Sequence, residues 1–259
     1  MTAIATSLGK LGTVEAGTGD TPIVFLHGVG SDKSVWAPQL VHFSRARRAI
    51  AFDYPGYGES SPAPEGTGRD DYAAAIFAGM DALGVEAAHV CGLSLGGVVA
   101  IAMHALAPER CASLVLADTF AVHPDGPGIY ERSIAASADL RALAEARVDF
   151  LIAPGALDDV RTEVIETMAR IDPSAYRIGA EAVWLADQRD RAAAIDVPTL
   201  VIVGEADRVT PPDLSRALAK TIPGAGFETI PGAGHISNLE RPAAFNAAVD
   251  EFLALAESR

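Results

Sequence analysis

One serine stands in a setting that suits a nucleophile. Residues 91–97 read CGLSLGG, so Ser94 lies between Gly92 and Gly96, at the end of the apolar run 88–93. A serine at a sharp turn from a strand into a helix can present its hydroxyl to a carbonyl carbon, and glycines relieve the crowding of such a turn. The pentapeptide alone also fits an ordinary glycine-rich turn. The chemistry that this arrangement indicates is acyl transfer through an acyl-serine.

A serine hydroxyl needs a general base at neutral pH, and His235 is the best candidate for it. Of the six histidines, only His235 follows the last predicted strand, in the loop PGAGHISNLERP. Glycines in that loop allow a side chain to be presented above the edge of a sheet. A loop histidine taken by itself is most often a solvated one. With Ser94 upstream, we interpret His235 as the base.

Two aspartates are candidates for the acid that orients the base. The expected chain order is serine, acid, histidine, and both Asp118 and Asp207 lie between Ser94 and His235. Asp207 lies in GEADRVTPP, just past an apolar run, and a loop at the carboxyl end of a strand faces the crevice of a parallel sheet. Asp118 ends the preceding apolar run. We therefore favour Asp207 and keep Asp118 as the alternative.

Two backbone N–H groups are expected to bind the oxyanion that forms during acyl transfer. One belongs to Leu95, which follows the nucleophile, and the other to Val29 in the loop LHGVGS. Both positions follow from the geometry of the serine turn and of the neighbouring strand-to-helix loop. A helix that begins at Leu95 would also direct its positive end toward the developing charge.

The elements that must position these residues alternate along the chain. Six short apolar runs are separated by longer segments of helical character, which predicts a parallel sheet covered by helices on both faces. The first thirty residues, with glycines between short alternating stretches, indicate an antiparallel hairpin at the sheet edge. The six runs are residues 23–27, 48–53, 88–93, 113–118, 199–204 and 227–230.

A long stretch after Asp118 carries no convincing strand. It contains three segments with helical spacing, at residues 137–152, 158–171 and 175–188, and Asp158 and Pro173 are placed to start helices. Because this stretch is threaded between two strands of one sheet, we interpret it as a helical cap over the carboxyl edge of the sheet.

Composition and charge narrow the class of protein. Lys and Arg number 20 against 34 Asp and Glu, a formal net charge of -14, which argues against nucleic acid and anionic membranes as partners. HExxH, paired CxxC and phosphate-loop sequences do not occur, so we expect no metal and no cofactor. Cys91 and Cys111 lie in apolar runs typical of reduced thiols, and the N-terminus lacks the pattern of a signal peptide. We expect a cytoplasmic protein whose oligomeric state stays open.

Several motifs together resemble those of the α/β-hydrolase fold superfamily: HGVGSD, DYPGYGESS, GLSLGGVVA, GEADRVTPP and GHISNLERPAAF. The resemblance implies a mostly parallel eight-stranded sheet flanked by helices, with an inserted helical cap. It covers about residues 21–121 and 196–255. The cap is assigned by its position alone, which divides the chain into a first core part at residues 1–121, a cap at 122–195 and a second core part at 196–259. The resemblance also implies that Ser94 is the nucleophile, Asp207 the acid and His235 the base.

Within that superfamily the chain is similar to 3-oxoadipate enol-lactonases in GSDKSVWAPQL, in GLSLGG with ALAPERCASLVLADT, and in HISNLERPAAFN. This similarity implies a small enol-lactone that bears a carboxylate. The hypothesis is a cofactor-free serine hydrolase of a small carboxylic ester or lactone. The alternatives are a C–C bond hydrolase of a vinylogous diketone, which can use the same three residues, and a ligand-binding protein that keeps the fold.

The substrate pocket is the least determined part of the prediction. Trp36, near the oxyanion loop, and Trp184, in the cap, are candidates for pocket walls, although large apolar residues usually belong to the core. Three cap arginines, Arg132, Arg177 and Arg189, are candidates for binding a substrate carboxylate, and none of them is favoured over the solvated surface that explains most such charges.

Overall fold

The computed structural model describes residues 2–258, which contain eight strands in one sheet. The order across the sheet is β1-β2-β4-β3-β5-β6-β7-β8. β3 to β8 run parallel, while β2 is antiparallel to β4 and pairs with β1 as an edge hairpin. The expected parallel sheet with an N-terminal hairpin is therefore confirmed. The strands are β1 (Thr2–Thr6), β2 (Gly9–Ala16), β3 (Ile23–Leu26), β4 (Ala49–Phe52), β5 (Ala88–Leu93), β6 (Cys111–Ala117), β7 (Thr199–Gly204) and β8 (Gly226–Ile230).

The register of the central strands brings the expected site residues to one edge. Leu26 of β3 lies opposite Gly92 of β5, Leu93 lies opposite Ala117 of β6, and Ala117 lies opposite Ile202 of β7. The loops that follow these strands therefore leave the sheet at similar heights. Ligands of open parallel sheets bind outside this carboxyl edge.

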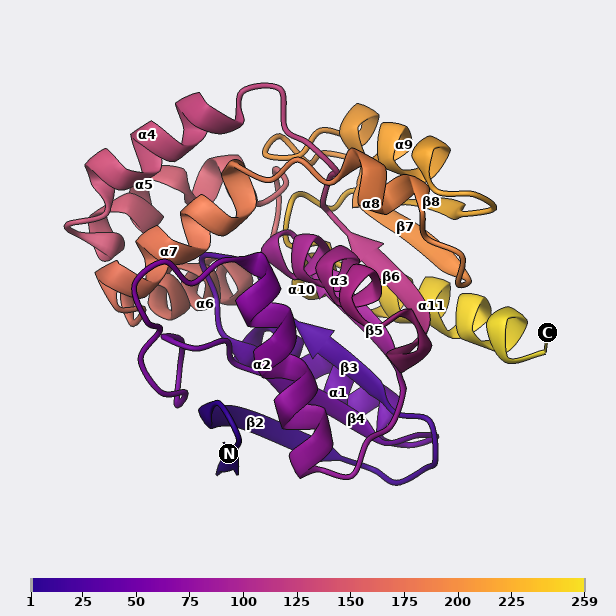
Figure 1. The fold of residues 1–259 in the computed structure, drawn as a ribbon. Helices are drawn as coiled ribbons and strands as arrows, with labels where there is room; N and C mark the ends of the chain where they lie inside the picture. The colour runs from indigo at the N-terminus through magenta and orange to yellow at the C-terminus, as the bar shows by residue number, and fades with distance from the viewer. Residues whose placement is uncertain (1, 259) are drawn as a thin grey trace.

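Helices cover both faces of the sheet, as Figure 1 shows. α2 (Arg69–Ala82) and α3 (Leu95–Leu106) pack together on one face, and α1 (Ala37–Phe43) and α11 (Pro242–Glu257) pack together on the other. α9 (Pro212–Thr221) packs against β7 on the α3 side, and the short α10 (Ser237–Glu240) precedes α11. Strands that are apolar throughout, such as the fully buried β3, fit a sheet covered on both sides.

Five helices lie in the chain between β6 and β7. They are α4 (Gly126–Ala136), α5 (Leu140–Leu151), α6 (Asp158–Ala169), α7 (Pro173–Trp184) and α8 (Arg189–Ala193). Four of them, α4 to α7, form a group beside the sheet in Figure 1, and we call these four the helical insertion. Side-chain caps set two of its boundaries, because Asp139 accepts from the N–H of Ala142 and Asp172 accepts from the N–H of Ser174.

The turn after β4 is held by a buried carboxylate. Asp53 accepts hydrogen bonds from the backbone N–H of Lys33, from Lys33 Nζ at 2.6 Å and from the N–H of Glu59. The hydroxyl of Ser60 donates to the backbone carbonyl of Asp53 at 2.8 Å. A buried charge needs such partners, so Asp53 and Ser60 organise this turn.

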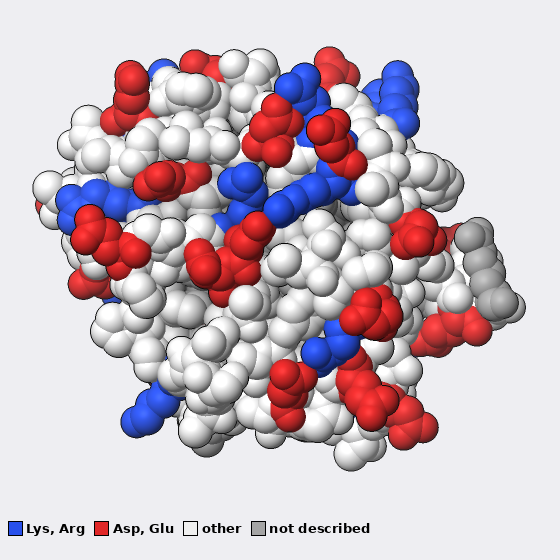
Figure 2. Space-filling view, in the orientation of Figure 1, with Lys and Arg blue, Asp and Glu red and all other residues white. Residues whose placement is uncertain are grey.

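The surface is mixed in charge. On the face drawn in Figure 2, acidic side chains are spread widely and basic ones lie next to acidic ones. Among residues 2–258, none of the helices combines the length and the apolar character that crossing a bilayer requires. The thiols of Cys91 and Cys111 are both free and buried.

Candidate active site

Ser94 has a strained backbone at the junction of β5 and α3. Its φ of 55° and ψ of -113° lie outside the regions that side chains with a Cβ normally adopt. The conformation is held by hydrogen bonds to the end of β6 and to the loop that follows it: the N–H of Ser94 donates to the carbonyl of Ala117 at 2.9 Å, and the hydroxyl of Thr119 donates to the carbonyl of Ser94 at 2.8 Å. A strained backbone that neighbouring hydrogen bonds hold in place often marks a functional residue, and here it sets the direction of the Ser94 side chain.

The glycines around Ser94 are required by close packing of the turn. A Cβ on Gly92 would overlap the carbonyl oxygen of Gly96, and a Cβ on Gly96 would overlap the carbonyl oxygen of Leu26. Backbone atoms cannot move aside as a flexible side chain could. The sequence GLSLG thus allows α3 to start directly against β3 and β5, with Ser94 at its first turn.

His235 and Asp207 form a buried pair. Nδ1 of His235 donates to Oδ2 of Asp207 at 2.9 Å. The other contacts of the aspartate are the N–H groups of Val209 and Thr210 on Oδ1, at 2.8 and 3.0 Å, and the hydroxyl of Thr210 on Oδ2 at 2.6 Å. With the proton on Nδ1, Nε2 of His235 is the nitrogen that is free to accept a proton.

The charges around His235 favour its protonated form. Burial lowers the pKa of His235, but the charge and the hydrogen bond of Asp207, with a further contribution from Asp118, outweigh it and raise the pKa above the ordinary value. Burial likewise acts to raise the pKa of Asp207, and His235 together with the Thr210 contacts reverses the effect, so that the pKa is lowered. The pair is thus suited to an ionised acid that stabilises an imidazolium.

Asp118 has a different set of partners from Asp207. Its Oδ1 accepts from the N–H of Gly204 at 2.8 Å, and its Oδ2 accepts from the hydroxyl of Ser237. Burial and the nearby charge of Asp207 raise the pKa of Asp118 well above its ordinary value. Of the two aspartates that sequence left open, Asp207 is therefore the one bonded to His235, while Asp118 joins the end of β7 to the start of α10.

Glu240, which the sequence analysis did not select, holds the loop that carries His235 in place through hydrogen bonds. The carboxylate of Glu240 accepts from the N–H groups of Gly234 and Ile236 through Oε1, and from the N–H of Ala153 through Oε2. The N–H of His235 donates to the carbonyl of Leu151 at 2.7 Å. The histidine loop and the end of α5 are therefore one hydrogen-bonded unit. The signal available in the sequence was an acidic residue close behind the histidine, in HISNLE.

The two expected oxyanion positions flank Ser94. A Cβ placed on Gly28, just before Val29, would lie 3.4 Å from the Cβ of Ser94, so this loop passes directly beside the serine. The Tyr57 hydroxyl donates to the carbonyl of Val29 at 3.2 Å, which fixes the orientation of the loop. Leu95 is the first residue of α3, where the N–H has no acceptor within the helix.

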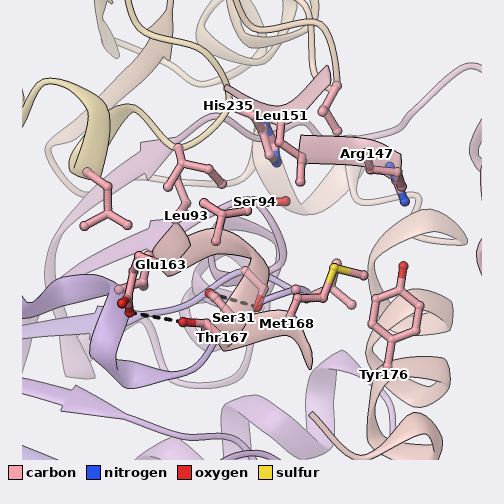
Figure 3. A pocket seen from close by; sticks show the side chains of 18 of the residues that line it. Ser31, Leu93, Ser94, Arg147, Leu151, Glu163, Thr167, Met168, Tyr176 and His235 are labelled. Carbon is pink, nitrogen blue, oxygen red and sulfur yellow. Dashed lines mark hydrogen bonds between the residues drawn. The ribbon is translucent and has the colours of Figure 1, made fainter. Parts of the chain in front are cut away.

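Ser94 and His235 line the same pocket, which lies between the sheet edge and the helical insertion (Figure 3). Apolar side chains make up most of its wall, including Leu93, Leu151 and Met168. Trp184 of α7 also lines it, as sequence suggested.

Trp36 requires a correction, because the structure places it in the core. Its side chain is fully buried, stacked on Phe25 with ring centroids 4.8 Å apart and tilted against Phe245 at 6.0 Å. Phe25 and Phe245 belong to the cluster on the α1 and α11 side of the sheet. The residue of this segment that reaches the pocket is its neighbour Val35.

The cation at the pocket is Arg147, which sequence reasoning did not select. Arg132 pairs with Asp125 at 2.7 Å and Arg189 pairs with Asp187 at 2.6 Å. Arg147 of α5 lines the pocket together with Ser94. Helical spacing alone could not identify it, because the face of α5 that meets the pocket depends on how the insertion packs.

Among residues 2–258, no group of three or more His, Cys, Asp or Glu side chains is arranged to hold a metal ion. The chemistry that the arrangement itself supports is nucleophilic: a strained serine, a histidine with a free Nε2, an ionised aspartate behind it, and nearby backbone N–H groups.

Comparisons with known proteins agree with this geometry. A family model described as "Alpha/beta hydrolase family" matches residues 23–248. The chain is 30% identical to 3-oxoadipate enol-lactonase 1 of Acinetobacter baylyi over 227 residues, 86% of this chain and 85% of that protein. It is 27% identical to a 2-hydroxy-6-oxononadienedioate/2-hydroxy-6-oxononatrienedioate hydrolase of Cupriavidus pinatubonensis, covering 92% of this chain and 89% of that protein. The crystal structure of the enol-lactonase from Burkholderia xenovorans superposes with a TM-score of 0.91 at 30% identity, covering 98% of this chain and all of that one.

Proposed function

We propose that this chain, which belongs to the alpha/beta hydrolase family, is a serine hydrolase that cleaves a small carboxylic ester or lactone. The observation that carries the proposal is the bonded pair of His235 and Asp207, which lies beside the strained Ser94 in one mainly apolar pocket. The two enol-lactonases described above, each about 30% identical over most of their length, support the lactone as the substrate class.

In the proposed mechanism, Ser94 Oγ attacks the carbonyl carbon while Nε2 of His235 takes its proton. The carbonyl electron pair moves onto oxygen, and the N–H groups of Val29 and Leu95 bind the oxyanion. When the intermediate collapses, the bond to the leaving oxygen breaks and His235 returns the proton to it. A water then attacks the acyl-serine with the same base, which releases the acid and restores Ser94. In a lactone, the leaving oxygen stays attached to the acyl group.

The helical insertion acts as a cap in this proposal. The chain then divides into a core at residues 1–121 and 196–259 and a cap at 122–195. Support comes from the pocket wall, since Leu151, Met168 and Trp184 all belong to the insertion and face Ser94 across the pocket. A cap that excludes water strengthens the electrostatic interactions on which the oxyanion depends.

A C–C bond hydrolase is the second candidate, because the Cupriavidus pinatubonensis relative is similar over most of both chains. A substrate panel separates the two. We expect turnover of enol-lactones and p-nitrophenyl esters, together with labelling of the protein by a fluorophosphonate. Hydrolysis of ring-cleavage diketones alone would replace the lactonase proposal, and a protein that neither reacts with the probe nor turns over any substrate would be a ligand-binding member of the family.

The activity is expected to decrease as the pH is lowered through the pKa of His235. His235 must be unprotonated to accept the proton of Ser94, and Asp207 and Asp118 raise the pKa of His235 above its ordinary 6.5, despite the opposing effects of burial and of the Arg147 charge. As the pH falls through that raised pKa, the base becomes protonated and kcat/KM is lost. With a neutral ester, whose own charge does not change, the acid limb should have its midpoint above 6.5. A midpoint below that value would contradict the arrangement of charges described above.

A further inference from the structure

Glu240 holds a buried carboxylate whose hydrogen-bond partners are three backbone N–H groups. Only 4% of Glu240 is exposed. Its Oε1 accepts from Gly234 at 2.9 Å and from Ile236 at 3.2 Å, and its Oε2 accepts from Ala153 at 2.7 Å. All three partners are donors, which suits an ionised carboxylate, and a buried charge costs free energy unless such bonds replace its hydration. The bonds therefore hold Glu240 to two segments that are distant in sequence.

Two of these bonds lie on either side of the base. Gly234 and Ile236 are the chain neighbours of His235, and their N–H groups converge on one oxygen of Glu240. The N–H of His235 itself donates to the carbonyl of Leu151 at 2.7 Å. Three successive N–H groups are thus fixed, so the direction in which the His235 side chain leaves the backbone is fixed with them.

The third bond joins the histidine loop to the helical insertion. Ala153 lies just after α5, and Gly234 comes so close to it that a Cβ on Gly234 would be 2.6 Å from the backbone nitrogen of Ala153. Apolar packing adds to this contact, because Ile236 and Leu239 pack against a cluster of residues in and beside α5 and α6, formed by Val148, Ile152, Val160 and Val164. The loop of His235 is therefore attached to α5 and α6 by polar and apolar contacts together.

The placement of His235 Nε2 matters for the proposed reaction. Nε2 must take the proton of Ser94, and a shift of about 1 Å from the productive geometry can lower a rate about 100-fold. The bond from Nδ1 to Asp207 holds the ring at one end. The bonds to Glu240 hold the backbone at the other end, so their loss would let the ring move relative to Ser94.

We propose that Glu240 is a positioning residue for the base: it holds the backbone of His235 at the end of α5 and so makes the placement of Nε2 depend on the helical insertion. This role rests on the proposed function and deepens it, because the insertion then takes part in proton transfer as well as covering the pocket. Glu240 is not among the residues that line the pocket, so its effect should fall on kcat and not on KM.

Two substitutions at Glu240 test the two parts of this role. Glutamine keeps a carbonyl oxygen that can accept from Gly234 and Ile236, while its NH₂ group then faces the N–H of Ala153. Leucine removes all three acceptors, and the closer match of glutamine keeps the test valid if leucine prevents folding. With p-nitrophenyl butyrate, kcat per active site should fall about tenfold in Glu240→Gln and about 100-fold in Glu240→Leu, with KM within about threefold of the native value. Titration of Ser94 with a fluorophosphonate counts the active sites.

Glu205 provides the matched control. It accepts from an N–H of the same loop, that of Gly232 at 3.0 Å, on the exposed surface, and Glu205→Gln should keep native kcat and KM. A role of Glu240 in stability alone would lower the unfolding midpoint and the number of active sites but leave kcat per active site unchanged. Native kcat in Glu240→Gln would overturn the link to the insertion, and native kcat in both Glu240 variants would overturn the positioning role.

Nuclear magnetic resonance tests the role without turnover. The proton on Nδ1 of His235, which is bonded to Asp207, should give a far-downfield signal that disappears in His235→Gln. This signal should shift or broaden in Glu240→Gln but not in Glu205→Gln. Exchange of the Ala153 N–H with solvent should become about tenfold faster in Glu240→Gln.

The outcomes for the two proposals are distinct. An unchanged Nδ1 signal would overturn the positioning role, and unchanged exchange at Ala153 would overturn the link to the insertion, whatever the protein hydrolyses. Changes in both would support the role of Glu240 even if no ester tested were hydrolysed, in which case the proposed function alone would fail.

Discussion

Replacement of Ser94 by alanine is expected to lower kcat for a p-nitrophenyl ester by about 10⁴- to 10⁶-fold, because the variant loses the nucleophile on which every covalent step depends. Alanine keeps the Cβ that the strained turn already accommodates. The turn is held through the backbone of residue 94, whose N–H donates to the carbonyl of Ala117 and whose carbonyl accepts from the hydroxyl of Thr119. The fold should therefore persist, with an unfolding midpoint close to the native one. Steady-state kinetics and circular dichroism check the two statements separately.

A second buried serine provides the control. Ser137 follows α4, and its hydroxyl donates only to the local carbonyl of Ile134. Ser137→Ala should keep native turnover and should still react with a fluorophosphonate, whereas Ser94→Ala should not react. Retention of labelling or of near-native activity in Ser94→Ala would remove Ser94 from the mechanism and overturn its assignment as the nucleophile.

The sheet could be predicted from sequence because its strands are short, apolar and bounded by loops, so that burial on both faces leaves a clear pattern. The insertion was harder. α4 begins in Gly126-Pro127-Gly128, a sequence that reads as a turn, although proline in the first turn of a helix costs no hydrogen bond. α8 is only five residues long, too short for periodicity to show. The helices expected at 137–152, 158–171 and 175–188 appear as α5, α6 and α7 with shifted ends, which capping by Asp139 and Asp172 explains for two of them.

The expected site residues lie together for the same reason, since each follows a strand whose position the pattern determines. The pocket wall depends instead on how helices distant in sequence pack. Trp36 and Val35 are adjacent in the chain, but their side chains leave a short helix in different directions. Trp36 therefore stacks on Phe25, while Val35 lines the pocket. Arg147 is visible as a pocket cation only once α5 is placed beside the pocket that Ser94 and Val209 also line. Residue type and local sequence pattern do not show how helices distant in sequence pack against one another, so they cannot identify the residues of the pocket wall.

Asp207→Asn is expected to lower kcat on the order of 10⁴-fold, whereas Asp118→Asn should cost about tenfold or less. The reason is the set of partners. Of the two aspartates, only Asp207 accepts the proton of His235 Nδ1. An asparagine there can present its NH₂ group instead, which favours the wrong histidine tautomer. Asparagine at position 118 keeps an oxygen that can accept from the N–H of Gly204 or from the hydroxyl of Ser237. The substitution therefore disturbs the segments that carry Gly204 and Ser237, but it leaves Asp207 in place as the acid.

The pH profile of Asp207→Asn and the activity of the double variant show whether Asp207 alone orients His235 or Asp118 can replace it. Loss of the Asp207 charge removes the main effect that raises the pKa of His235, so the acid limb of the residual activity in Asp207→Asn should move to lower pH. If Asp118 took over the orienting role, adding Asp118→Asn to Asp207→Asn would lower activity by a further large factor. We expect the second substitution to add little, because the two oxygens of Asp118 are committed to Gly204 and Ser237 and so are not placed to accept the Nδ1 proton of His235.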